Sequence, residues 1–143
     1  MKINKLNFDP EYDEFELIGI VSSLKEYKLA WLINKVLDIK MVKEPDIIFN
    51  FINEAKISVS NYVYKLEYGN FRFLKNRASE VINIKVPFLL PELKQYDYLI
   101  KLEQISYTFP SEKVIDLLKT INQILFVQEL SVNKLKSKEN LIF

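Results

Sequence analysis

The chain has 143 residues, of which 49% are hydrophobic and 27% charged, a composition typical of one globular domain. It contains no Cys and no His and only two glycines, which excludes disulfides, thiolate chemistry, most zinc sites, histidine-based acid–base catalysis and glycine-rich phosphate loops. The net charge of +1 provides no overall field for nucleic acid, and the first residues lack the apolar run of a signal peptide. We therefore expect a cytoplasmic, non-enzymatic protein with no cofactor and no membrane segment.

The first part of the chain predicts a strand over residues 15–20 and a helix over residues 23–37. Ser23 and Glu26 have the spacing of a capping box, in which both side chains accept hydrogen bonds from backbone N–H groups at the helix start. The core-facing stripe of this helix consists of Leu29, Leu32, Ile33, Val36 and Leu37.

The predicted helix also has a second apolar face, nearly opposite the first, with Leu24, Tyr27 and Trp31. Lys28 and Lys35 form the only clearly polar strip between the two faces. Two interpretations are open for the second face. Either other parts of the chain cover it, or Tyr27 and Trp31 belong to a partner surface such as the seam of a homodimer.

The middle of the chain is rich in strand patterns. Residues 39–43 and 46–52 are strand-like, and Glu44-Pro45 separates them because proline cannot donate to a sheet. Residues 81–86 alternate in polarity until Pro87 ends the run.

A β-hairpin is predicted where residues 62–68 and 71–77 flank Gly69-Asn70, a two-residue turn of the glycine-first type. This register places Glu67 opposite Arg72, a favourable cross-strand pair. We expect the aromatic face of the hairpin to cover the core, although aromatic side chains on a sheet can also stack on bases. That face contains Tyr64, Leu66, Tyr68, Phe71 and Phe73.

The last third predicts a strand over residues 98–102, a helix over residues 111–125 and a closing strand over residues 126–132. The order of elements predicts a single α+β domain over residues 1–143. In it, two main helices, at about 23–37 and 111–125, pack on a mostly antiparallel β-sheet whose strand order the sequence does not give.

A chemically mixed stretch precedes the strand at 98–102. It runs from Leu90-Pro91-Glu92 to Tyr96-Asp97-Tyr98 and predicts a turn held against a buried strand. Its carboxylates, Glu92 and Asp97, either accept backbone N–H bonds around the turn or converge in a site for acid–base or Mg²⁺ chemistry. A further acidic group lies near the start of the chain, at Glu11, Asp13 and Glu14.

This stretch resembles the signature of the IPExxxVDY family of Bacteroidetes bacteria, with Leu90 in place of Ile and Tyr96 in place of Val. Further similarity lies in residues 15–20, 27–34 and 134–143, so the resemblance extends over nearly the whole chain. The family is named for residues and not for an activity. The resemblance therefore implies a family and no particular reaction or ligand.

The first functional hypothesis is a non-enzymatic protein-interaction domain, such as a homodimer, that uses Tyr27 and Trp31. The second is an RNA-associated accessory protein that binds phosphate through Lys134, Lys136 and Lys138, whose side chains project together only where the chain is extended. The third is a carboxylate-based enzyme, which requires Glu92 and Asp97 to converge in a pocket.

Overall fold

The computed structural model describes residues 15–51, 54–85 and 87–143. The described strands are β1 (Phe15–Val21), β2 (Val42–Asn50), β3 (Lys56–Lys65), β4 (Asn70–Lys75), β5 (Glu80–Ile82), β6 (Tyr98–Glu103) and β7 (Phe126–Leu130). The described helices are α1 (Glu26–Leu37) and α2 (Ser111–Leu118), with 3-10 helices η2 (Pro91–Leu93), η3 (Val132–Lys134) and η4 (Lys138–Leu141).

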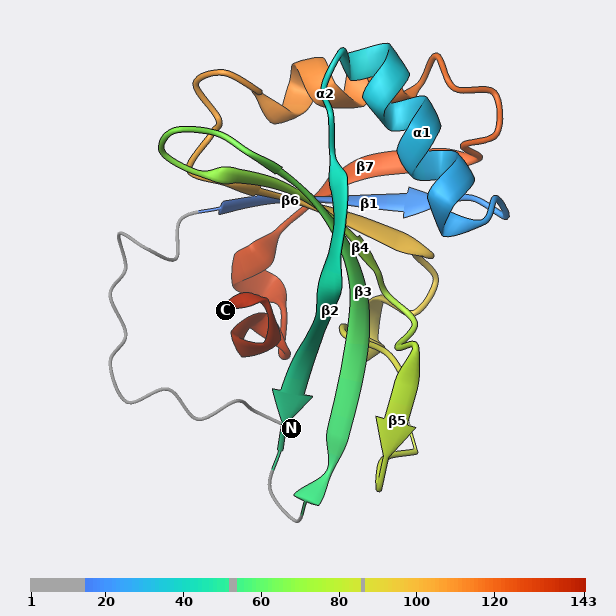
Figure 1. Ribbon diagram of the computed structural model, residues 1–143, viewed down its shortest axis with the longest axis vertical. Helices are drawn as coiled ribbons and strands as arrows, with labels where there is room; N and C mark the ends of the chain where they lie inside the picture. Colours follow the sequence, from blue (N-terminus) through green and yellow to red (C-terminus); the bar gives the residue numbers. More distant parts are fainter. Residues whose placement is uncertain (1–14, 52–53, 86) are drawn as a thin grey trace.

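These strands form one antiparallel sheet with the spatial order β2-β3-β4-β6-β1-β7, which confirms the predicted α+β fold (Figure 1). β5 pairs with the part of β3 that β4 leaves uncovered. Within the described residues, no helix is both long enough and apolar enough to cross a membrane.

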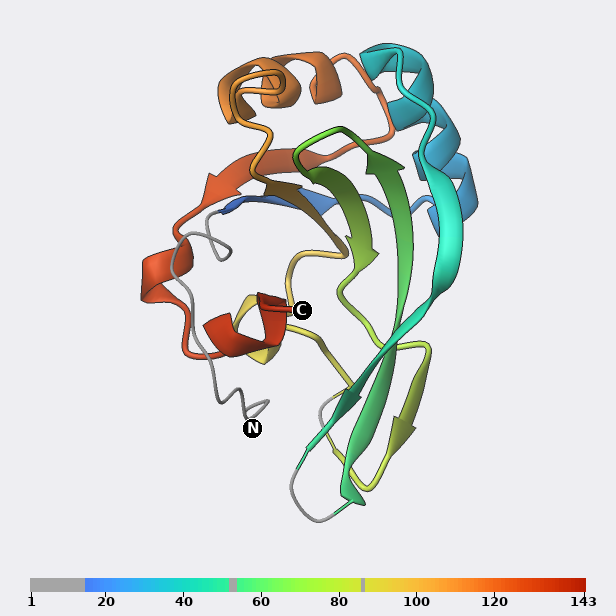
Figure 2. The ribbon, with the colours of Figure 1, turned by 60° about the vertical axis from the view of Figure 1, so that its left-hand side comes forward.

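The central strands are buried on both faces of the sheet. Helices α1 and α2 lie on one face, and the C-terminal 3-10 helices lie on the other (Figures 1 and 2). Ile18 of β1 packs in the core under the two helices, whereas its neighbour Leu17 packs in the second core with Leu141 of η4. Because successive side chains of a strand point to opposite faces, most side chains on both sides of β1 and β6 are apolar, and Lys101 of β6 is a buried exception.

The predicted hairpin forms, but its predicted register is wrong. β3 and β4 pair Tyr64 with Phe71 and Lys65 with Asn70, so a longer loop joins them than the predicted two-residue turn. The shift is an even number of residues, so Tyr64, Phe71 and Phe73 keep their predicted face. Tyr68 does not, because it lies in the loop and is 78% exposed. Phe71 and Phe73 are fully buried under the helices, as expected for a face that covers the core.

Gly69 is required for close packing and not for the turn conformation. No described glycine has a positive φ, so the glycine-first turn does not form. A Cβ atom on Gly69 would lie 1.8 Å from the backbone oxygen of Glu103, which ends β6. The chain therefore passes directly against the neighbouring strand at this point, and only glycine fits.

The predicted start of the first helix and the predicted end of the second need correction. Helix α1 starts at Glu26 with Lys25 as a cap that makes no side-chain hydrogen bond, so the Ser23–Glu26 capping box is wrong. The Glu26 carboxylate instead accepts a hydrogen bond of 2.7 Å from the Ser60 hydroxyl on β3. Helix α2 ends at Leu118 and not at residue 125, because tight turns follow in which the Thr120 hydroxyl donates to the Leu117 carbonyl.

Two strand predictions also change. The predicted runs at 39–43 and 46–52 contribute to one strand, β2, which covers only Val42–Asn50, and Pro45 lies in its bulge between Glu44 and Ile47. Residues 39–41 and 51 are not in a strand, and residue 52 lies outside the described residues. β2 is an edge strand of the sheet that the described residues form, and an edge strand tolerates proline on its unpaired side. The strand expected over 81–86 ends at Ile82, since Asn83 takes a left-handed conformation with φ of 55°.

Replacing Gly69 by alanine should destabilise the fold by about 1–3 kcal/mol, because the new methyl group must push two backbone segments apart. Urea unfolding followed by circular dichroism measures the change. The matched control is Tyr68→Ala at the neighbouring position, which is 78% exposed and should change stability by no more than about 0.5 kcal/mol. Equal unfolding midpoints for Gly69→Ala and the wild type would contradict the close approach.

Candidate functional site

The candidate functional site is an apolar groove on the outer side of α1. Tyr27 and Trp31 are 58% and 62% exposed there, so the described chain does not cover the second apolar face. The groove has a volume of about 600 Å³, and its lining is Leu24, Tyr27, Lys28, Trp31, Leu32 and Gln123. It is the kind of exposed apolar patch that marks an interaction surface.

The helical repeat places these residues together. Tyr27 and Trp31 are four residues apart and therefore neighbours on the helix surface. The opposite side of α1 is fixed to the sheet by Leu29 and Ile33, both fully buried. Gln123 reaches the groove from the turns after α2, and its carbonyl accepts a hydrogen bond of 2.8 Å from the Ser22 hydroxyl. The groove is therefore built on a firmly packed helix.

A buried tyrosine holds the start of α1 in place. The Tyr98 hydroxyl on β6 donates a hydrogen bond of 2.5 Å to the carbonyl of Leu24, at the edge of the groove. Burial, and after it the negative charges of Glu26 and Asp97, raises the pKa of Tyr98 to about 12. The hydroxyl therefore stays protonated and remains a donor at neutral pH.

The charges around the groove are positive. Lys28 belongs to the lining, and the ammonium of Lys35 lies 5.2 Å from the centroid of the Trp31 ring, within the range of a cation–π contact. The lining formed by the described residues contains no carboxylate. This arrangement can bind an apolar side chain that has acidic neighbours.

The stretch Leu90–Tyr98 forms a turn that delivers β6 into the sheet. Glu92 accepts a hydrogen bond of 2.8 Å from the N–H of Ser137, whereas Asp97 accepts one of 2.9 Å from the N–H of Ser22. Both carboxylates thus accept backbone N–H bonds, but from distant segments and not around the turn, where the structural interpretation placed them. They do not share a site. Tyr96 is buried, and its hydroxyl is bound by the Gln128 side chain.

The lysines near the C-terminus do not have the geometry that the RNA hypothesis required. Lys134 ends η3 and Lys138 begins η4, so the segment is not extended and that premise is wrong. Lys136 lies between the two turns and is exposed. The acidic residues Glu11, Asp13 and Glu14 lie outside the described residues.

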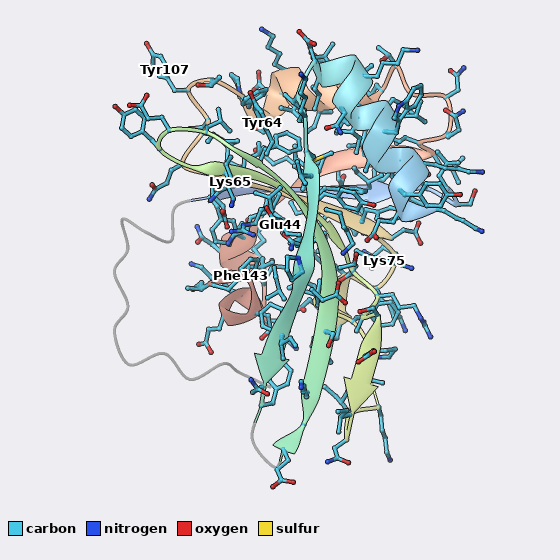
Figure 3. All side chains as sticks on the ribbon, in the orientation of Figure 1. Glu44, Tyr64, Lys65, Lys75, Tyr107 and Phe143 are labelled. Atoms are coloured by element: carbon cyan, nitrogen blue, oxygen red, sulfur yellow. The ribbon has the colours of Figure 1, made fainter. Side chains whose placement is uncertain are left out.

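A second cavity, of about 270 Å³, is lined by a cluster of paired charged side chains. Glu103 on β6 lies 2.6 Å from the Lys101 ammonium and 2.8 Å from the Arg72 guanidinium, and Lys101 is only 3% exposed. The Phe143 ring covers both cations, at 4.0 Å from Lys101 and 5.2 Å from Arg72. Figure 3 shows Phe143 on the side of the sheet away from the helices.

Burial alone would raise the pKa of Glu103, but Lys101 and Arg72 outweigh this effect and hold the pKa below its usual range. Perturbed carboxylates in cavities are candidates for function. Here, however, both carboxylate oxygens already accept hydrogen bonds from the sheet's own side chains, including Asn70 at 3.0 Å. We therefore assign Glu103 a structural role in joining β4 to β6.

Sequence reasoning missed this cluster. It placed Arg72 opposite Glu67 on the hairpin, whereas Arg72 instead binds Glu103 on β6, which the β4–β6 register brings alongside. Sequence reasoning also assigned no role to Gln123, because no local pattern links the turns after α2 to α1. Within the described residues, no group of three or more acidic side chains has the geometry of a metal site.

Comparisons with known proteins add no functional assignment. No family model matches the chain, and no curated protein matches its sequence.

The Glu103→Gln variant should lose about 3 kcal/mol of stability at pH 7, because it leaves two cations in a buried site without their carboxylate. The folded-state pKa of Glu103 lies below its ordinary value of 4.5, so its contribution is present above about pH 4.5 and is lost as the pH falls through the folded-state pKa. The gap between variant and wild type should therefore narrow in acid. Urea unfolding at pH 7 and at lower pH measures both effects.

The matched control is Glu67→Gln, which removes an exposed carboxylate from the loop after β3. It should cost no more than about 0.5 kcal/mol at either pH. A larger loss for Glu67→Gln than for Glu103→Gln would restore the hairpin pairing of Arg72 and overturn the structural assignment.

Proposed function

We propose that this chain is a protein-interaction domain that binds a partner in the groove on α1. The observation that supports the proposal is the exposure of Tyr27 and Trp31, at 58% and 62%, on a helix whose other side is buried. Tyrosine and tryptophan are the side chains that most often dominate binding energy at interfaces. The absence of His and Cys supports a binding role in preference to a catalytic one.

The charges around the groove favour one occupant, an amphipathic segment of another protein with acidic residues beside its apolar ones. Such a segment would place carboxylates near Lys28 and Lys35 while its apolar side chains fill the groove. A second copy of the chain is disfavoured, since a two-fold contact between α1 helices would bring Lys28 and Lys35 of both copies into one interface without a carboxylate from its lining. A homodimer is thus the alternative outcome of the test.

We also infer membership of the IPExxxVDY family from the motif at residues 90–98 and the similarity at residues 134–143. This inference supplies no activity. It supports the interaction proposal only in that the motif residues Glu92 and Asp97 bind backbone groups of the fold and are not left for catalysis.

Selection of a displayed peptide library against the wild-type protein tests the groove. The selected peptides should combine leucine or aromatic residues at helical spacing with aspartate or glutamate. Trp31 is the only tryptophan, so binding should shift its fluorescence to shorter wavelength. Trp31→Ala should weaken binding about 30-fold or more, as expected for an interface hot spot of roughly 2 kcal/mol.

Two controls keep this test specific. Val42→Ala removes another exposed apolar side chain, on β2, and should leave peptide affinity unchanged. Size-exclusion chromatography with light scattering should report a monomer. A dimer that Trp31→Ala dissociates would assign the groove to a second copy, and selected peptides that bind Trp31→Ala equally well would contradict the proposal.

A further inference from the structure

We propose that a cationic cavity at the start of α1 binds a small phosphate-bearing molecule. The cavity has a volume of about 390 Å³ and lies between the residues that lead into α1, the end of β4 and the turn before β6. Its lining includes four cationic side chains, Lys25, Lys75, Arg77 and Lys94. Figure 3 shows Lys75 at the side of the sheet where α1 begins.

The charge of this cavity is far from balanced. Four cations face one carboxylate, Asp97, an excess of three positive charges in a chain whose net charge is only +1. The ion pairs within the described residues use other cations: Lys43, Lys65, Arg72 and Lys101. The four cavity cations have no carboxylate within ion-pair distance in that part of the chain. Their mutual repulsion is unfavourable, and a bound anion would reverse it.

Two acidic side chains near the cavity, Asp97 and Glu26, each accept a hydrogen bond from another part of the fold. Asp97 accepts a hydrogen bond from the N–H of Ser22 and so orders one wall of the cavity. Glu26 is bound to Ser60 on β3 and does not belong to the lining. The start of α1 lacks a side-chain cap, so its first N–H groups add partial positive charge to the same wall. The cations remain the principal attraction for an anion.

The size and walls of the cavity indicate a small molecule. Its volume falls within the range of about 300–1,000 Å³ for small-ligand sites. Phe88, Tyr96 and Tyr98 provide an aromatic wall, and the Arg77 guanidinium lies 5.7 Å from the centroid of the Phe88 ring. A phosphate or diphosphate would meet the cations while an attached apolar or ring-shaped group contacts the aromatic wall. A nucleic-acid strand would need a groove that continues along its backbone.

Titration of the full-length ¹⁵N-labelled protein with sodium pyrophosphate and with ADP, followed by amide NMR shifts, tests the site. Saturable shifts are expected at Lys25, Glu26 and Tyr27, at Lys75 and Arg77, and they should weaken as salt is raised. Sodium chloride at equal ionic strength should not reproduce them. Pyrophosphate reports the phosphate subsite alone, and tighter binding of ADP would report the aromatic wall.

Four variants test how the charge of the lining changes the affinity for pyrophosphate. Arg77→Gln and Lys94→Gln should each weaken pyrophosphate binding about five-fold, the size expected for one exposed charge beside the ligand. Asp97→Asn keeps an oxygen for the Ser22 N–H but removes the opposing charge, and should strengthen binding by a similar factor. Lys134→Gln, outside the cavity, should have no effect.

Several results would overturn the proposal: no saturable shift, equal affinity in Arg77→Gln, Lys94→Gln and the wild type, or binding of single-stranded RNA without binding of pyrophosphate or ADP. Dispersed amide spectra confirm that each variant is folded, and the two glutamine variants decide the matter even where Asp97→Asn does not fold. The result is independent of the α1 groove, because Trp31→Ala should leave pyrophosphate affinity unchanged.

Discussion

Asn76 is fully buried after β4, and its side-chain amide binds the turn that precedes β6 at three points. It donates to the carbonyls of Leu93 and Tyr96, at 2.9 and 3.1 Å, and accepts from the N–H of Leu90 at 2.9 Å. A buried turn needs such partners, because each backbone group without one costs on the order of 1–3 kcal/mol. The position of β6, and with it the centre of the sheet, therefore depends on this amide.

The turn that Asn76 holds also determines the position of the chain before α1. The turn places Tyr98 at the start of β6, where its hydroxyl holds the Leu24 carbonyl, and it places Asp97 where its carboxylate holds the Ser22 N–H. These two contacts fix the chain just before α1. Leu24 lines both the apolar groove and the cationic cavity, so both proposed sites share a wall whose position is set from β6.

The sequence predicts what depends on periodicity and misses what depends on distant contacts. Alternation gave the correct faces of Tyr64, Phe71 and Phe73 even though the hairpin register was wrong, because the error was an even shift. The observed register places Gly69 directly against β6, a distant contact that no local pattern records. The predicted capping box was wrong because of a distant contact as well. Glu26 binds Ser60, which lies 34 residues further along the chain.

The two candidate sites also differ in how far they depend on periodicity or on distant contacts. One helix supplies most of the α1 groove, so the second apolar face of the sequence was enough to identify Tyr27 and Trp31. The cavity cations come from four positions between residues 25 and 94, and only the fold brings them together.

Whether a charged residue is available to bind a ligand depends on whether the fold already supplies it with a partner. The conspicuous motif carboxylates Glu92 and Asp97 accept backbone N–H bonds, and Glu103 is saturated by its neighbours. Residues that attract attention in the sequence are thus used by the fold. The four cavity cations have no carboxylate within ion-pair distance among the described residues, and in the proposed site a phosphate would supply that partner.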